Sequence, residues 1–92
     1  MLLVAYDISD TKIRTRFSKF LKKFGHRLQY SVFEIKHSEK ILNNIVSEIK
    51  TRYEKDFGHA DSVIIFKIPK NAHAKTIKFG YAKDMDDDIL FL

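Results

Sequence analysis

The sequence of 92 residues contains no cysteine, three glycines and one proline. Without cysteine the chain cannot form disulfides, thiolate zinc sites or a cysteine nucleophile, and it suits a reducing cytoplasm. So few glycines also exclude a glycine-rich phosphate-binding loop. No segment approaches the roughly 20 apolar residues of a membrane span, and residues 1–7 lack the basic start of a signal peptide. We therefore expect a cytoplasmic protein with no membrane partner.

The residues that are present have the balance of a folded globular protein. Apolar residues make up 45% of the chain and charged residues 32%. The length predicts a single domain over 1–92, with a core over 1–68 and a C-terminal extension over 69–92. A chain this short buries only about 60–65% of its unfolded surface, so self-association would help to stabilise it.

The first third of the chain combines a strand pattern with a helix pattern. An apolar run over 2–6 predicts a strand that ends at Asp7. Ser9 or Asp10 can cap the helix that follows, and Gly25 closes that helix. For Asp10, a capping role is favoured over a role as a metal ligand. Apolar residues at helical spacing form one stripe along it: Ile13, Phe17, Phe20, Leu21 and Phe24.

The middle third predicts one strand and one helix. Residues 26–36 are rich in β-formers and predict one long strand, bulged at Val32 and Phe33. Ser38 then caps a second helix, whose apolar stripe reaches Tyr53.

Strand patterns return in the last third, over 63–68, 76–81 and 89–92. Two helices between strands predict an α+β fold of ferredoxin type, with both helices on one face of an antiparallel sheet. In such a sheet the open face should alternate apolar with polar residues. Residues 2–5 and 63–66 do not alternate, so both faces need cover. No third helix is available, and we expect a homodimer packed sheet against sheet.

Positive charge is concentrated in one segment. The net charge is +5, yet the stretch from Thr11 to Phe33 has no carboxylate and seven cations: Lys12, Arg14, Arg16, Lys19, Lys22, Lys23 and Arg27. Such a segment indicates a polyanionic partner, nucleic acid first, although a solvated helix face would look the same. On a helix, one narrow stripe holds Lys12, Arg16, Lys19 and Lys23, whereas Arg14 lies on the other flank of the apolar stripe.

Asp7 is the leading candidate for chemistry because it lies between a strand end and a helix start. The structural alternative is that Asp7 stabilises the turn into the helix. One carboxylate is too few to hold a catalytic Mg²⁺, but a dimer with Asp7 near its two-fold axis would supply a second. Tyr6, Tyr30 and Phe33 could stack on bases, or pack in the core, which is favoured for Phe33. The acidic run over 84–88 is more typical of a solvated loop than of a cation site.

Residues 5–10, 14–16 and 25–34 together resemble the CRISPR-associated Cas2 proteins, the small subunits of the spacer-acquisition machinery. The likeness continues in order and spacing from residue 2 to about residue 68. Its most specific parts are the Tyr-Asp strand end and the segment Gln-Tyr-Ser-Val-Phe-Glu over 29–34. The resemblance implies a ferredoxin-like βαββαβ homodimer. It also implies a tight turn near Tyr30 and Ser31, which would divide the long strand in two.

The resemblance implies two classes of function. In one, the dimer bridges dimers of a partner integrase and holds incoming double-stranded DNA; the nucleic-acid-binding candidates are Lys12, Arg14, Arg16, Lys19, Lys23 and Arg27. In the other, the protein is a metal-dependent endonuclease for single-stranded RNA or double-stranded DNA. Asp7 of each subunit would then hold Mg²⁺ or Mn²⁺, and the activity-linked positions would be Asp7, Arg14, Arg16, Arg27 and Phe33. The structural role ranks first, since no Lys or His is evidently placed as a general base. A toxin-like RNase on the same fold is a third possibility.

Overall fold

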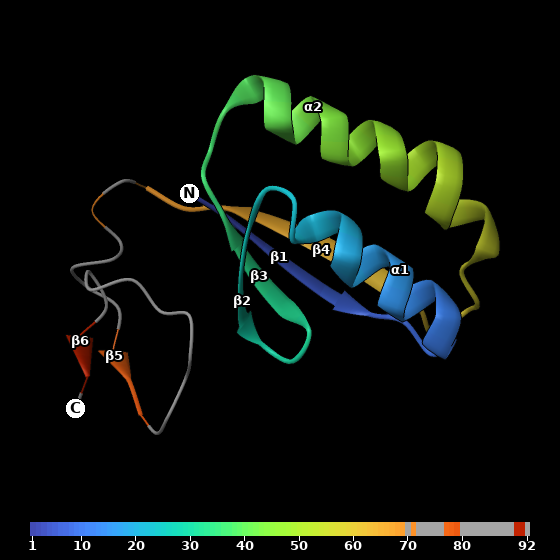
Figure 1. Ribbon diagram of the computed structural model, residues 1–92, viewed down its shortest axis with the longest axis horizontal. Helices are drawn as coiled ribbons and strands as arrows, with labels where there is room; N and C mark the ends of the chain where they lie inside the picture. Colours follow the sequence, from blue (N-terminus) through green and yellow to red (C-terminus); the bar gives the residue numbers. More distant parts are fainter. Residues whose placement is uncertain (70, 72–76, 80–89, 92) are drawn as a thin grey trace.

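A four-stranded antiparallel sheet and two helices form the main body of the chain (Figure 1). The computed structural model describes residues 1–69, 71, 77–79 and 90–91. The elements of the main body are β1 (Leu2–Asp7), α1 (Thr11–Leu21), β2 (Gly25–Gln29), β3 (Val32–Ile35), α2 (Glu39–Glu48) and β4 (Ser62–Lys67). The strand order β2-β3-β1-β4 and the chain order βαββαβ give the predicted ferredoxin-like α+β fold.

The helices begin where the sequence places their caps. The Asp10 carboxylate accepts a hydrogen bond from the Ile13 backbone N–H at 3.0 Å, and the Ser38 hydroxyl accepts one from Ile41 N–H at 3.0 Å. The second helix continues past α2 through a π-helical turn, η1 (Ile49–Tyr53), and a 3₁₀ turn, η2 (Glu54–Asp56). Both helices lie over the same face of the sheet (Figure 1).

Gly25 does not close the first helix, so that prediction is wrong. Helix α1 ends at Leu21, and Gly25 is the first residue of β2. A Cβ atom at Gly25 would overlap the carbonyl oxygen of Glu34 on β3, so the two strands can approach this closely only at a glycine. The early helix end also removes Lys23 from the predicted helical stripe and leaves it in the turn that follows.

The segment 26–36 is two strands and not one. β2 and β3 are antiparallel neighbours joined by a turn at Tyr30 and Ser31, as the family resemblance implies. The Ser31 carbonyl accepts a hydrogen bond from Tyr6 N–H at 3.0 Å, which ties this turn to β1. The irregularity predicted at Val32 and Phe33 lies instead in β2, where the register shifts between Arg27 and Gln29.

The core lies between the sheet and its two helices. Its buried apolar side chains come from β1 and the loop after it, α1, β3, α2 and η1: Leu2, Val4, Tyr6, Ile8, Phe17, Phe20, Leu21, Phe33, Ile35, Ile45 and Tyr53. Aromatic rings at its centre meet edge to face, with Tyr6 and Tyr53 at 5.2 and 5.0 Å from Phe17 between ring centroids. Tyr53 thus belongs to the buried stripe of the second helix, as predicted.

Within the residues that the structure describes, no helix lies over the opposite face of the sheet. Side chains alternate between the two faces along a strand, and the register places Leu3 opposite Phe66 and Ala5 opposite Ile64. Ile64 is 52% exposed and Phe66 48% exposed. We call these four residues the outer apolar face. The sequence pattern predicts that a second copy of the chain covers this face, and that dimer stays a prediction.

Two short strands follow the main body. β5 (Ile77–Lys78) and β6 (Leu90–Phe91) pair in parallel and fall within the predicted strands at 76–81 and 89–92. The other residues of those two segments, apart from Phe79, lie outside the described residues, as does the acidic run over 84–88. In the described part of the chain, no helix has the length and apolar character needed to cross a membrane.

Candidate functional site

Asp7 is exposed at the end of β1, where it pairs with Ser62 of β4. The alternation of side chains along β1 places Asp7 on the same face of the sheet as Leu3 and Ala5, at the edge of the outer apolar face. Among residues 1–69, 71, 77–79 and 90–91, no three His, Cys, Asp or Glu side chains gather closely enough to hold a metal ion. One copy of the chain therefore does not provide a Mg²⁺ site by itself, because Asp7 supplies one carboxylate.

The loop after Asp7 is held by Arg14. One guanidinium nitrogen, Nη1, donates hydrogen bonds to the carbonyls of Ile8 at 2.9 Å and Ser9 at 3.4 Å. The other, Nη2, donates to the Thr11 hydroxyl at 3.2 Å. Arg14 thus uses much of its hydrogen-bonding capacity on the connection between β1 and α1, and its first role is to position that loop.

A second anchor of this loop, Asp61, was not among the predicted site residues. Its Oδ1 accepts hydrogen bonds from the Ser9 backbone N–H at 2.9 Å and the Ser9 hydroxyl at 2.8 Å. Its Oδ2 accepts one from Gly58 N–H at 2.8 Å. The Gly58 and Ser9 hydrogen bonds lower the pKa of Asp61. The contact joins residues 52 positions apart, and the only sequence signal is a short acidic side chain just before β4.

Arg27 and Phe33 are stacked on the helix-covered side of the sheet. The guanidinium carbon of Arg27 lies 5.4 Å from the centre of the Phe33 ring. Phe33 has no exposed surface and also stacks against Tyr6, with ring centroids 6.3 Å apart. Phe33 cannot touch a substrate from this position. It supports Arg27 and the core instead, which agrees with the core packing favoured from the sequence; the link to activity that the resemblance implies for Phe33 stays a prediction.

Tyr6 lies next to Arg27 in the same layer and is 5% exposed. Burial raises the pKa of the Tyr6 hydroxyl, while the positive charges of Arg27 and Arg14 act against that rise. A base-stacking role for Tyr6 is not supported by its burial. Tyr30, in the turn between β2 and β3, is 70% exposed, so its ring is accessible for stacking on a base.

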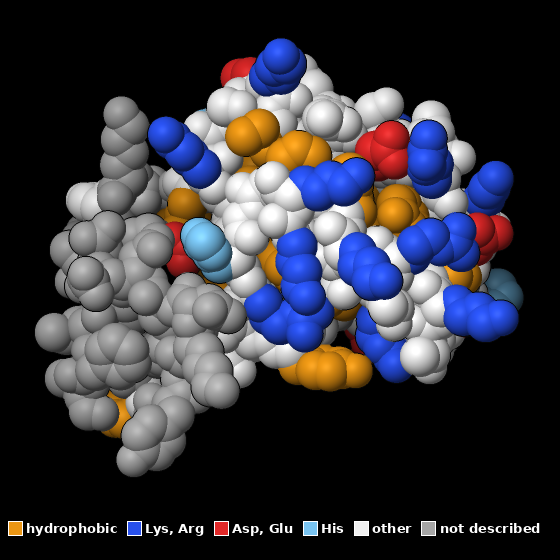
Figure 2. Space-filling model, viewed as in Figure 1, with side chains coloured by type: hydrophobic (Ala, Val, Ile, Leu, Met, Phe, Trp, Pro, Cys, Tyr) orange, Lys and Arg blue, Asp and Glu red, His pale blue; other side chains and the backbone are white. Residues whose placement is uncertain are grey.

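The cations of α1 form two groups. One lines a shallow surface hollow of about 320 Å³ along the helix: Lys12, Arg16 and Lys19, together with Thr11 and Thr15. Figure 2 shows Lys and Arg side chains spread over the helix-bearing side of the molecule. All three cations are exposed, as the predicted stripe requires.

The second group faces β2. Arg14 and Arg27 line one pocket there together with Lys19 and Lys22, and Arg16 does not line it. Arg14 and Arg16 therefore lie on different flanks of the helix, as predicted. Asp7 lies on the opposite face of the sheet from this pocket, because Tyr6, its neighbour in β1, points toward the helices. The predicted residues therefore divide into separate places and do not form one catalytic cluster.

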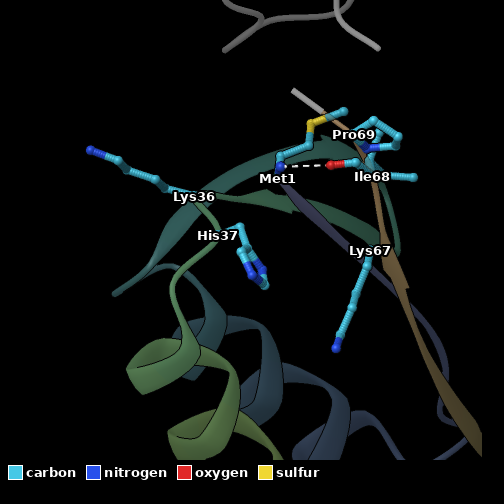
Figure 3. Close-up of a pocket in the computed structure, with 6 residues that line it drawn as sticks. All are labelled: Met1, Lys36, His37, Lys67, Ile68 and Pro69. Carbon is cyan, nitrogen blue, oxygen red and sulfur yellow. Dashed lines mark hydrogen bonds between the residues drawn. The ribbon is translucent and has the colours of Figure 1, made fainter. Parts of the chain in front are cut away.

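A cavity of about 550 Å³ gathers none of the predicted residues. It lies at the start of β1, at the far end of that strand from Asp7, and the Met1 ammonium donates a hydrogen bond to the Ile68 carbonyl at 3.0 Å beside it (Figure 3). In Figure 3, the side chains of Lys36 and Lys67 point away from each other. The lining residues are Met1, Lys36, His37, Lys67, Ile68 and Pro69.

Comparisons with known proteins agree with this architecture. Residues 1–76 match the family described as CRISPR associated protein Cas2. The CRISPR-associated endoribonuclease Cas2 of Thermus thermophilus is 31% identical over 80 residues, which cover 87% of this chain and 82% of that protein. A hypothetical protein from Thermus thermophilus, TT1823, matches in structure with a TM-score of 0.60 and 30% identity, over 74% of this chain and 79% of that one.

The crystal structure of Streptococcus pyogenes Cas2 at pH 6.5 shares the fold with a TM-score of 0.73, covering 86% of this chain and 98% of that one. At 23% identity, that likeness concerns the fold alone. The family match over most of the chain places this protein in the CRISPR-associated Cas2 family, several of whose members are named endoribonucleases.

Proposed function

We propose that this protein is a homodimeric nucleic-acid-binding subunit of a CRISPR spacer-acquisition complex, which bridges integrase dimers and holds incoming double-stranded DNA. The observation that carries the proposal is the exposed cationic surface of α1, formed by Lys12, Arg16 and Lys19. Contacts of this kind neutralise phosphates without reading sequence, which suits a protein that must accept DNA of any sequence.

The outer apolar face supports the dimer. Ile64 and Phe66 are each about half exposed and lie beside Leu3 and Ala5 on neighbouring strands. A contiguous apolar surface of this kind on a small domain is typical of a protein interface. A second copy placed on this face would cover it and leave α1, on the other side of the sheet, free for DNA.

The DNA-binding role predicts a change in salt dependence when the cations are removed. Replacing Lys12, Arg16 and Lys19 together by Gln should weaken duplex binding and flatten the plot of log affinity against log salt, by about 0.9 for each phosphate that the variant no longer neutralises. Fluorescence anisotropy with a duplex of arbitrary sequence measures both quantities. The matched control replaces three exposed lysines of the second helix and its extension: Lys40, Lys50 and Lys55. If the slope falls equally in both triple variants, net charge is responsible and the α1 surface is not the DNA path.

The bridging role is tested separately. Mixing the protein with the integrase of the same CRISPR locus and duplex DNA should give a complex with two integrase dimers for each dimer of this chain, as measured by size-exclusion chromatography with light scattering. A mixture in which the proteins elute separately at micromolar concentration contradicts this role.

A metal-dependent endonuclease is the second candidate, favoured by the exposure of Asp7 and by the names of the relatives. Two copies packed through the outer apolar face could supply one Asp7 carboxylate each, and the fit to Mg²⁺ or Mn²⁺ depends on that pairing. When bound, such a metal stabilises charge at a scissile phosphate and activates water.

Asp7→Asn separates the two candidates. If the chain is a nuclease, this variant should lose Mg²⁺- or Mn²⁺-dependent cleavage of single-stranded RNA or duplex DNA while keeping its affinity for duplex DNA. Cleavage that persists in Asp7→Asn removes the paired carboxylates from the reaction. Loss of integration with the dimer intact would instead show that Asp7 serves the acquisition complex directly. The toxin-like RNase stays a prediction, favoured by a neighbouring antitoxin gene in place of an integrase gene.

A further inference from the structure

A second basic pocket lies between α1 and β2, on the sheet face that carries the helices. Its volume is about 260 Å³. The lining residues come from β1, α1, β2 and the turn after β2: Tyr6, Arg14, Thr15, Ser18, Lys19, Lys22, Arg27 and Tyr30. Arg14, Ser18 and Lys22 follow one another at four-residue spacing, so they form a row on the flank of α1 that faces β2.

The charge of this pocket has one sign. Four of its lining side chains are cations and none is an aspartate or glutamate. Lys19 and Lys22 are exposed at its rim, whereas Arg14 and Arg27 are half-buried. Cations held this close in a partly desolvated hollow repel one another, and a bound anion would relieve that repulsion.

Arg27 is one of the two half-buried cations of the pocket, and its side chain is close enough to the Tyr6 hydroxyl for a hydrogen bond that acts to lower the pKa of that hydroxyl. Its Nε atom is buried and has no hydrogen-bond partner among the described residues. Buried polar atoms in folded proteins are nearly always hydrogen-bonded, so an unpaired one calls for an explanation. The Phe33 ring below fixes the guanidinium, with 5.4 Å between its carbon and the ring centre. Because Nε itself is enclosed, a phosphate oxygen in the pocket would accept hydrogen bonds from the part of the guanidinium that lines it.

Tyr30 adds an aromatic surface at the mouth of the pocket. It is 70% exposed in the tight turn between β2 and β3, and it takes part in none of the ring–ring contacts among the described residues. Exposed aromatic rings beside cations are typical of sites that stack unpaired bases. The pocket is smaller than the roughly 300–1,000 Å³ of sites that enclose a whole drug-sized ligand, so it suits a phosphate inside and a base outside.

We propose that this pocket binds one nucleotide of a single strand, with its phosphate between Arg27 and Lys22 and its base stacked on Tyr30. The proposal rests on the nucleic-acid-binding function and adds a single-strand contact to the duplex surface of α1. Lys19 belongs to both surfaces, so a duplex along α1 could continue into an unpaired end at this pocket.

Single substitutions separate this pocket from the duplex surface. In the full-length protein, Tyr30→Ala should weaken binding of a short fluorescent single-stranded oligonucleotide about five- to a hundred-fold, the usual effect of losing one base stacked on an aromatic ring. Tyr30→Phe keeps the ring and should bind as the wild type does. Lys22→Gln should weaken single-strand binding and lower its salt slope by about 0.7. Lys40→Gln is the matched control, because Lys40 is an exposed lysine of α2 that does not line the pocket and removes the same single charge.

The same variants are titrated with blunt duplex DNA, for which Tyr30→Ala should bind within twofold of the wild type. The proposal is overturned if Tyr30→Ala and Lys22→Gln bind the single strand as Tyr30→Phe and Lys40→Gln do. It is also overturned if Tyr30→Ala weakens single-strand and duplex binding equally. Wild-type protein that binds neither probe would overturn the nucleic-acid-binding function itself, and with it this proposal.

Discussion

Both faces of the β2-β3-β1-β4 sheet carry apolar side chains, although Glu34 lies opposite Leu3 on the outer face, and the helices of the described chain cover only one of the two faces. On the helix-covered face, Leu2, Val4 and Phe33 are fully buried. On the outer face, Ile64 and Phe66 remain about half exposed. The difference shows that the single chain completes one core and leaves Ile64 and Phe66 of the other face partly exposed, as the proposed dimer requires. Charge follows the same division, because the two basic surfaces lie on the helix-covered side.

The largest loss of stability should come from a substitution on the helix-covered face of the sheet. Phe17 is fully buried and contacts the rings of Tyr6, Phe20 and Tyr53. Phe17→Ala should lower the free energy of unfolding by about 3–5 kcal/mol, because it removes a large side chain and leaves a cavity. Urea unfolding measures the loss, which should be the same at low and high protein concentration.

Phe66→Ala on the outer face sharpens that comparison. Phe66 is half exposed in the single chain, so it should stabilise a dimer and not the monomer. The difference in free energy of unfolding between the wild type and Phe66→Ala should therefore grow with protein concentration. A loss of several kcal/mol that does not depend on concentration would mean that Phe66 belongs to the core of the single chain.

An intermediate loss of stability is expected from a substitution at Gly25, where β2 pairs with β3. Gly25→Ala should destabilise the protein by about 1–3 kcal/mol, because its Cβ would collide with the Glu34 backbone of the paired strand. Gly58→Ala is the control, since its Cβ would meet Asp61 at 3.7 Å, an ordinary contact. Urea midpoints that fall equally in both variants would show that the close approach of β2 and β3 is not the cause.

The smallest change in stability is expected at the loop between β1 and α1, where Asp61 binds Ser9. The hydrogen bonds to Asp61 lower its pKa, so its carboxylate stabilises the fold above the ordinary aspartate pKa of about 4, and this is lost as pH falls through the lowered pKa. Asp61→Asn should therefore be less stable than the wild type at pH 7, and the difference should shrink in acid. Urea midpoints measured across that range check the sign; a difference that does not change with pH contradicts it.

Much of this fold could be predicted from local patterns. The helical spacing from Ile13 to Phe24 and the cap at Ser38 are local signals, and the structure confirms the helices that they predict, though α1 ends earlier, at Leu21. The turn at Tyr30 and Ser31 could not be predicted in this way, because no Gly or Asn marks it. Only the family resemblance indicated it.

The site was less predictable because its geometry depends on distant parts of the chain. The stripe of Lys12, Arg16 and Lys19 follows from helical periodicity alone. The row of Arg14, Ser18 and Lys22 becomes one wall of a pocket only because β2 packs beside it. Asp61 reaches Ser9 across the antiparallel pairing of β1 with β4, which no local pattern encodes. Gly25 resembled a helix cap because its true neighbour, Glu34, lies on another strand.

The pairing of two outer faces is tested most directly by the mass of the protein in solution. Size-exclusion chromatography with light scattering should give about twice the 10.8 kDa of one chain. The double variant Ile64→Glu, Phe66→Glu should give the mass of one chain while its circular dichroism stays that of the folded protein. A wild-type chain that remains monomeric at several hundred micromolar would contradict the pairing of outer faces, and with it the shared Asp7 site and the bridging dimer.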